Sequence, residues 1–90
     1  MNEQITTNDR FETAYYMTYD FSIQKVKFIK EKDKIIPEFT ITGDGLDKVV
    51  RRYYDHKALL NLSEFEEKIK HIDELVKNEF ELYLEGGNEI

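Results

Sequence analysis

A change of hydrophobic period in the middle of the chain limits the fold most. From Phe21 the hydrophobic period changes to two, and Val26 and Phe28 alternate with Lys25 and Lys27. This pattern predicts two strands, each with one dry and one wet face, joined by turn-like residues 31–34. A hairpin of two strands is only marginally stable in water, so it has to pack against helices.

Two irregularities are expected within this hairpin. Ile23 and Val26 lie in opposite parity along the first strand. The switch predicts a β-bulge near Gln24 and Lys25. In the second strand Pro37 has no N–H to give to a ladder, so we expect that position to face an edge of the sheet.

The residues before the hairpin have helical spacing. Residues at intervals of three and four form one face: Phe11, Ala14, Tyr15 and Thr18. The spacing predicts a helix over 7–19, with Thr6 or Thr7 as its cap. No glycine closes this helix near Asp20.

Two more helices are predicted after the hairpin. The second covers 44–55 with Asp44 as cap, and the third covers 62–84 with Asn61 as cap. Between them we expect a short extended piece over 56–60. The apolar stripes of the two helices are Leu46, Val49, Val50 and Tyr53, and then Phe65, Ile69, Ile72, Val76 and Phe80.

The expected fold is a small α+β domain that spans residues 1–90 in the order α-β-β-α-α. Its hairpin packs on the helices, and a long acidic helix ends the chain. A chain of 90 residues has room for one core. Residues 1–5 and 86–90 are expected to fray.

Several classes of function are not expected. The chain has no cysteine, which excludes disulfides, thiol catalysis and zinc sites built on thiolates. No apolar run approaches the ~20 residues of a membrane span, so we expect a cytoplasmic protein. The two histidines, His56 and His71, lie on different elements, and Gly43-Asp44-Gly45 matches a helix-cap turn more than a phosphate loop. We therefore expect no enzyme, no metal and no cofactor.

Charge is unevenly distributed along the chain. The net charge is −6, residues 1–60 carry ten acids and ten basic residues, and residues 61–90 carry nine acids against three lysines. Five lysines fall close together in the hairpin: Lys25, Lys27, Lys30, Lys32 and Lys34. The sequence thus predicts a basic patch near its middle and an acidic C-terminal end.

Several segments stand together in a recognisable order: Thr6-Thr7-Asn8-Asp9, Lys25-Val26-Lys27-Phe28, Val49-Val50-Arg51-Arg52-Tyr53-Tyr54, Ala58, Asn61 and Phe65. In these the chain resembles a family of short uncharacterised proteins, a domain of unknown function found in phages, prophages and other mobile elements. The likeness runs from about Thr6 to Val76. It departs from the family in having no glycine after the first helix and Leu62 where a proline is expected. The resemblance implies a mobile-element origin, and so the host cytoplasm, but no activity.

The favoured hypothesis is a non-enzymatic accessory protein that binds another protein, for example as an inhibitor of host defence. Exposed tyrosine beside arginine is typical of interfaces, and apolar residues at the end of the third helix have no evident cover. The expected contact residues are Arg52, Tyr54, Phe80, Tyr83 and Leu84, with a homodimer through 76–84 as one form. The alternative is that these residues pack within the monomer.

A second hypothesis is binding of nucleic acid. Alternating lysines on the hairpin, with Arg51 as part of a second row, would meet phosphates. The alternative role of the same lysines is to protect a short sheet edge from aggregation. The expected contacts are Lys25, Lys27, Lys30, Lys32, Lys34 and Arg51.

Overall fold

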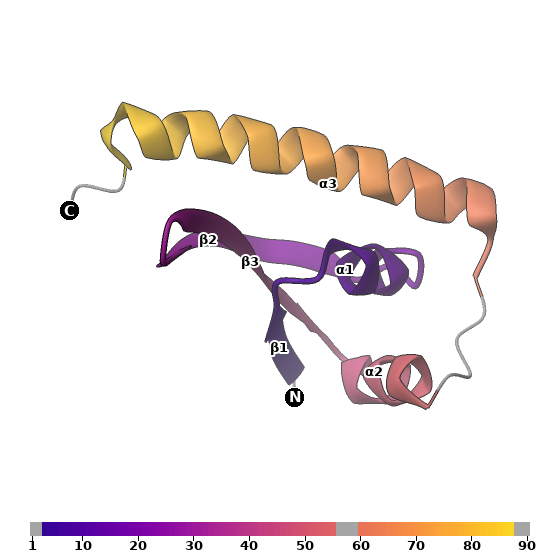
Figure 1. Ribbon diagram of the computed structural model, residues 1–90. Coiled ribbons are helices and arrows are strands. Elements are labelled where there is room, and N and C mark those ends of the chain that lie inside the picture. The colour runs from indigo at the N-terminus through magenta and orange to yellow at the C-terminus, as the bar shows by residue number, and fades with distance from the viewer. Residues whose placement is uncertain (1–2, 56–59, 88–90) are drawn as a thin grey trace.

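The computed structural model describes residues 3–55 and 60–87. An antiparallel three-stranded sheet in the order β1-β3-β2 packs with three helices in this part of the chain (Figure 1). The elements are β1 (Glu3–Thr7), α1 (Arg10–Met17), β2 (Ser22–Glu31), β3 (Lys34–Gly43), α2 (Leu46–Tyr54), α3 (Leu62–Leu82) and a π-helical turn, η1 (Tyr83–Gly87). The predicted α+β class is confirmed.

Strand β1 was not predicted. Residues 1–5 were expected to fray, but residues 3–5 are the first part of this strand, which pairs with β3 from Glu3 opposite Gly43 to Thr7 opposite Phe39. A strand with one large apolar residue, Ile5, gives little signal by itself. It forms because β3 offers it a row of unpaired backbone groups. The observed order is therefore β-α-β-β-α-α.

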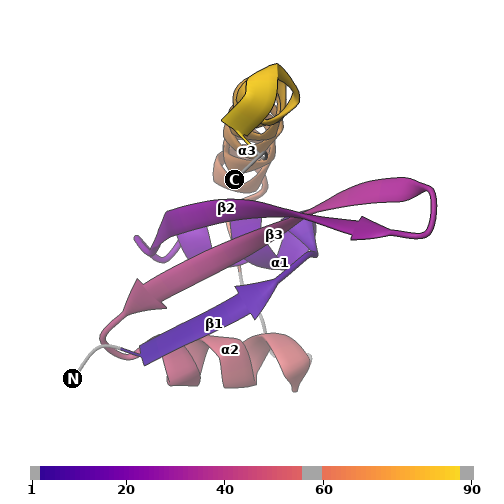
Figure 2. The same cartoon turned by 90° about the vertical axis from the view of Figure 1, so that its left-hand side faces the viewer.

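The helices lie on one side of the sheet and at its two edges. Helix α1 lies behind the sheet, α2 lies beyond β1, and α3 runs beyond β2 (Figure 2). No helix of the described residues covers the opposite face. The core between the sheet and the helices consists of Ala14, Tyr15, Tyr16, Phe39, Ile41, Leu46 and Ile72.

The hairpin has both of the expected irregularities. The register shifts between Ile23 and Lys25, which confirms the bulge. Pro37 lies opposite Phe28 of β2, whereas the β1 pairing ends at Phe39. Strand β3 is central in the sheet, yet Pro37 has a neighbouring strand on one side only, which a residue without N–H tolerates.

Helix α1 begins later than predicted and is rotated. Its cap is Asp9, whose Oδ1 accepts from the backbone N–H of Phe11 at 2.9 Å and of Glu12 at 3.2 Å. Thr7 was an expected cap, but its hydroxyl oxygen instead accepts from the N–H of Asp9 at 3.1 Å. Phe11, expected to be buried, is 50% exposed, and Tyr16, expected at the side, is completely buried.

The end of α1 explains how the chain manages without a glycine there. The N–H of Phe21 bonds to the carbonyl of Tyr16 at 3.3 Å, and the N–H of Asp20 to that of Met17 at 3.1 Å. This pair of bonds is a Schellman motif, which needs a left-handed residue before Phe21. Asp20 adopts it with φ 71°, a conformation that aspartate tolerates better than most residues.

Helix α2 takes its N-terminal cap from a distant strand. It begins after Gly45, which has φ 80° and no side chain to offer, whereas Asp44 was the expected cap. The N–H of Asp47 is satisfied by Oε1 of Glu3 at 3.0 Å. A carboxylate at a helix N-terminus also complements the helix dipole, so β1 and the start of α2 stabilise each other.

Helix α3 confirms its predicted cap and stripe. Oδ1 of Asn61 accepts from the N–H of Glu64 at 3.1 Å. Its 21 residues span about 32 Å at 1.5 Å per residue, close to the longest dimension of the molecule, 39 Å. Ile72 is completely buried, and Phe65, Ile69 and Val76 pack around the core. Most of the expected extended piece, 56–59, lies outside the described residues.

Candidate interaction surfaces

A buried carboxylate joins β1, α1 and α2. Glu12 is 4% exposed. Its Oε1 accepts from the Thr7 hydroxyl at 2.8 Å, and its Oε2 accepts from the hydroxyls of Tyr16 at 2.5 Å and Tyr54 at 2.9 Å. Three donors on one carboxylate offset its loss of water. The arrangement is fully bonded, so it acts as a structural link rather than a reactive group.

The tyrosines around this link have raised pKa values. The hydrogen bond to Glu12, followed by burial, raises the pKa of Tyr54 to about 12. Burial is the main cause for Tyr16 and Tyr53, whose pKa values are also raised. Burial likewise raises the pKa of Tyr15 to about 12. The neutral phenols are therefore favoured in the folded protein.

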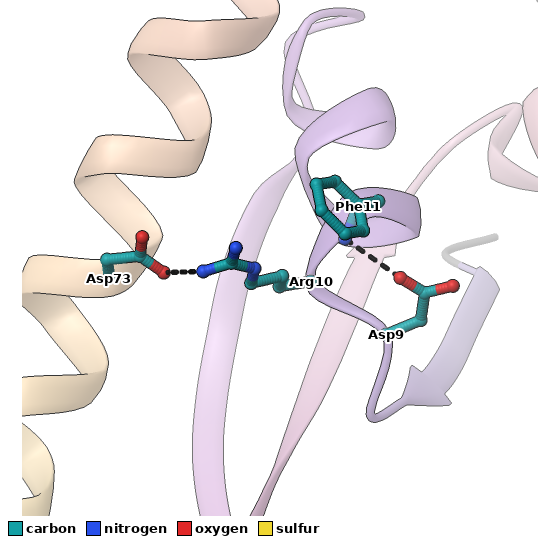
Figure 3. Close-up of polar contacts among 4 residues, drawn as sticks. All are labelled: Asp9, Arg10, Phe11 and Asp73. Carbon is teal, nitrogen blue, oxygen red and sulfur yellow. Dashed lines mark hydrogen bonds and ion pairs between the residues drawn. The ribbon is translucent and has the colours of Figure 1, made fainter.

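Figure 3 shows the contact between α1 and α3. The guanidinium of Arg10 lies 2.8 Å from Oδ1 of Asp73 and 5.0 Å from the centre of the Phe11 ring. Phe11 in turn stacks on Phe65, with ring centres 6.2 Å apart. Both charged side chains are about half exposed, so this ion pair contributes on the order of 0–1 kcal/mol and positions the helices more than it stabilises them.

Of the predicted protein contacts at the end of α3, a name that here includes the π-helical turn η1 directly after it, two are partly covered. Phe28 of β2 lies 5.5 Å from Phe80 and 5.2 Å from Tyr83 between ring centres. Both rings are half-buried, so packing inside the monomer accounts for part of this apolar end. Leu82 and Leu84 are different, since they are 57% and 64% exposed.

The other two predicted protein contacts lie elsewhere. Arg52 and Tyr54 are on α2, which lies below the sheet, whereas the end of α3 lies above the hairpin at the other end of the molecule (Figure 1). The Tyr54 side chain is 61% exposed, but its hydroxyl is bonded to Glu12. The structure therefore does not bring the five predicted residues into one surface.

Three acidic residues of α3 form a regular row. Glu67, Glu74 and Glu81 are seven residues apart and exposed, so they share the outer face of the helix. Lys70 and Lys77 follow the first two at i+3, a spacing that compensates charge. The last turn has no basic residue, so the negative charge is concentrated at the end that carries Leu82 and Leu84.

The hairpin lysines are all exposed, but they do not form one track. Lys27 lies directly opposite Glu38, and Lys34 opposite Glu31. Lys32 occupies the turn with φ 55°. Arg51 borders the hollow beside β1, at the other edge of the sheet from β2. Acidic neighbours and distance thus dilute the predicted basic surface.

A hollow borders each edge of the sheet. One, of about 360 Å³, lies between β1 and α2 and is lined by Glu3, Gln4, Ile5, Leu46, Asp47, Val50 and Arg51. The other, of about 290 Å³, lies between β2 and α3 and is lined by Ile23, Gln24, Lys25, Val26, Leu75 and Glu79. Neither hollow was predicted from the sequence. The first depends on β1, a strand that the sequence pattern did not predict.

The part of the chain that the structure describes contains neither a metal-binding cluster nor a membrane-spanning helix. Within residues 3–55 and 60–87, no group of three or more histidine, aspartate or glutamate side chains is placed to hold a metal ion. His71 is exposed on α3, and His56 lies outside the described residues. No helix of the same residues is long and apolar enough to cross a bilayer.

Comparison with known proteins adds no relative to this description. No family model, no curated protein and no solved structure matches the chain.

Proposed function

We propose that this protein is not an enzyme and acts by binding another protein through the end of α3. One observation carries the proposal: Leu82 and Leu84 stay 57% and 64% exposed beside a ring cluster that already covers Phe80 and Tyr83. Single exposed leucines are common. Leu84 follows the Phe80 ring at i+4, the spacing of residues that share one side of a helix and act as apolar anchors in a partner's groove. Leu82, two positions before Leu84, adds exposed apolar surface on another side of the same helix end.

The charge of this end favours a partner with a basic rim. Glu79, Glu81 and Glu85 lie around the two leucines, at the negative end of the helix dipole and without a basic residue in the last turn. A second copy would bring the same negative charge against itself, which disfavours a homodimer. The resemblance to proteins of mobile elements supports a host protein, such as a component of host defence, as the partner.

The experiment compares two exposed ends of the same helix. The double variant Leu82→Ser, Leu84→Ser removes the proposed anchor, and Leu62→Ser changes a leucine that is 65% exposed at the other end. We expect host lysate to yield a protein retained by the wild type and by Leu62→Ser but lost with the double variant. A strictly monomeric protein that retains nothing would contradict the proposal. Concentration-dependent dimers in sedimentation, lost in the double variant, would identify the partner as a second copy.

Nucleic-acid binding by the hairpin is the second candidate. It is favoured by the exposure of Lys25 and Lys27 on a sheet face that no helix of the described residues covers. Labelled single- and double-stranded oligonucleotides at about 50 mM salt, where such binding is strong, provide the test. Binding that Lys25→Glu abolishes and Arg51→Glu leaves intact would support it, and no binding at that salt would exclude it.

A further inference from the structure

We propose that the hollow between β1 and α2 binds an extended segment of another protein, which adds to the sheet as a fourth strand. Within the described residues β1 pairs with β3 alone, so its other side has no partner strand. Such an edge is a template for pairing with another chain. Residues Glu3–Thr7 contain no lysine, proline or bulge that would protect this edge, and the element that flanks it is the helix α2.

The lining residues place the hollow along this edge. Three consecutive residues of β1, Glu3 to Ile5, border it. Because successive side chains point to opposite faces of a strand, a hollow that touches all three runs along the strand's side. From α2 the lining residues fall at i, i+1, i+4 and i+5, which is one helix face: Leu46, Asp47, Val50 and Arg51.

An edge strand beside a helix, with a groove between them, suits β-strand addition. The added segment bonds to the strand through its backbone, and its alternate side chains enter the groove. The volume of about 360 Å³ lies at the lower end of the ~300–1,000 Å³ typical of ligand sites. It therefore suits the few side chains that a short strand would present to α2.

The residues that line the groove indicate which side chains the bound segment of the partner should carry. Ile5 and Val50, both half-buried, give the lining its accessible apolar surface, whereas Leu46 is completely buried. Alternate residues of the partner should therefore be apolar. Glu3 and Asp47 lie at one end, where the Glu3 carboxylate is bonded to the Asp47 N–H. Arg51 is exposed and supplies the positive charge of the lining. A carboxylate on the partner would be placed beside it.

The position of α2 argues against a second copy as the occupant. Antiparallel neighbours in one sheet are related by a twofold axis perpendicular to it, so two copies joined at β1 would carry both α2 helices on the same face. Each helix flanks its own β1 closely, and the two would compete for the space beneath the joined edges. An isolated extended segment has no such helix.

The test uses a synthetic peptide of about six residues, a common strand length, in which valine and threonine alternate before a terminal glutamate. The matched control peptide has proline at its centre, which removes a backbone donor. Amide shifts and hydrogen exchange measured by NMR are expected to change along β1 and α2, with protection gained at Gln4 to Thr6. The control peptide is expected to leave them unchanged.

Two neighbouring arginines provide the matched protein variants. Arg51 lines the groove, whereas Arg52 does not, and both are exposed. Arg51→Glu should weaken peptide binding by about five- to tenfold, the scale of one charge contact, and Arg52→Glu should change it little. Circular dichroism checks that both variants are folded.

The outcomes separate this site from the end of α3. Peptide shifts confined to β2 or α3, equal effects of the two arginine variants, or no shift at millimolar peptide would overturn the proposal. A β1-to-β1 dimer seen by NMR would replace the peptide with a second copy. Because the double variant at Leu82 and Leu84 leaves this groove intact, it should bind the peptide normally whether or not the α3 proposal holds.

Discussion

The two edge strands of the sheet, β1 and β2, differ in how they are protected from pairing with another chain. Strand β2 has a bulge at Ile23 and Lys25, lysines on its outer face, and Phe28 held by rings of α3. Strand β1 has none of these and is flanked by α2 through a bond from Glu3. The β2 edge is thus protected by its own residues, whereas the β1 edge depends on α2, which is held by its buried apolar face and by the Glu3 bond.

The largest expected effect contrasts the apolar side chains of the two hollows. Leu46→Ala should lower the free energy of unfolding by about 3 kcal/mol. Leu46 is completely buried, so the smaller side chain leaves a cavity that neighbouring side chains do not fill. Leu75→Ala, beside β2, should cost about 1 kcal/mol because that side chain is only half-buried. Urea denaturation of both variants measures the difference. Equal losses would mean that the two edges rely on their helices to the same degree.

The next largest effect concerns Gly43, which lies opposite Glu3 of β1. A Cβ at this position would approach the ring of Phe21 to 2.5 Å. Gly43→Ala should therefore destabilise the protein by about 2 kcal/mol, as an overpacking change. Thermal unfolding measures the loss, and Phe21→Leu in the same background should recover part of it. A neutral Gly43→Ala variant would show that Phe21 moves aside freely.

The polar link of the β1 side is tested by Glu12→Gln. The amide of glutamine has one acceptor oxygen and no charge, so it cannot accept from Thr7 and from both tyrosine hydroxyls as the Glu12 carboxylate does. We therefore expect a loss of about 1–2 kcal/mol. Glu38→Gln, on the outer face of β3, should change stability by less than about 0.5 kcal/mol. If the two variants behave alike in chemical denaturation, the link contributes nothing that a surface carboxylate does not.

The same link predicts a pH dependence. The pKa of Tyr54 is raised to about 12 in the folded protein from its ordinary value of about 10. The neutral phenol therefore adds stability that is complete below pH 10 and disappears as the pH rises toward 12. Unfolding measured across this range should show a fall in stability, and Tyr54→Phe should make the fall shallower. A slope unchanged by Tyr54→Phe would assign the fall to the other tyrosines.

The smallest expected effect is a gain at the β2–β3 turn. Lys32 has φ 55°, which costs a residue with a Cβ about 1–2 kcal/mol. Lys32→Gly removes that cost but makes the unfolded chain more flexible, so a net gain of about 0.5 kcal/mol is expected. Asp20→Gly, at φ 71°, should gain less, because aspartate tolerates this conformation. Thermal unfolding of the two variants tests the ranking.

Local patterns predicted much of the fold. The alternation around Val26 predicted the hairpin and its bulge. Asn61 and the apolar stripe around Ile72 predicted α3 and its cap. Each of these features depends on residues close together in the chain. Their signal is therefore present in the sequence itself.

Features that depend on distant partners were missed. The Glu3–Asp47 and Tyr54–Glu12 bonds join residues 44 and 42 positions apart, and no spacing rule connects them. Glu12 resembled an ordinary acidic residue of a first helical turn, although Tyr16 four positions later was a neighbour on the same face. A weak signal for β1 did exist in the β-branched run from Ile5 to Thr7.

The cap that α2 borrows from Glu3 has a consequence for the order of assembly. Strand β1 pairs with β3, which lies roughly 35 residues further along the chain. Closing such a long loop costs conformational entropy, and the contacts that offset this cost are available only after the β2–β3 hairpin has formed. The N-terminal cap of α2, which Glu3 supplies, forms at the same late step. Strand β1 should therefore open before the hairpin in native-state exchange, and the cap that it provides to α2 should be lost with it. Transient release of this strand would give an incoming chain access to β3 without global unfolding.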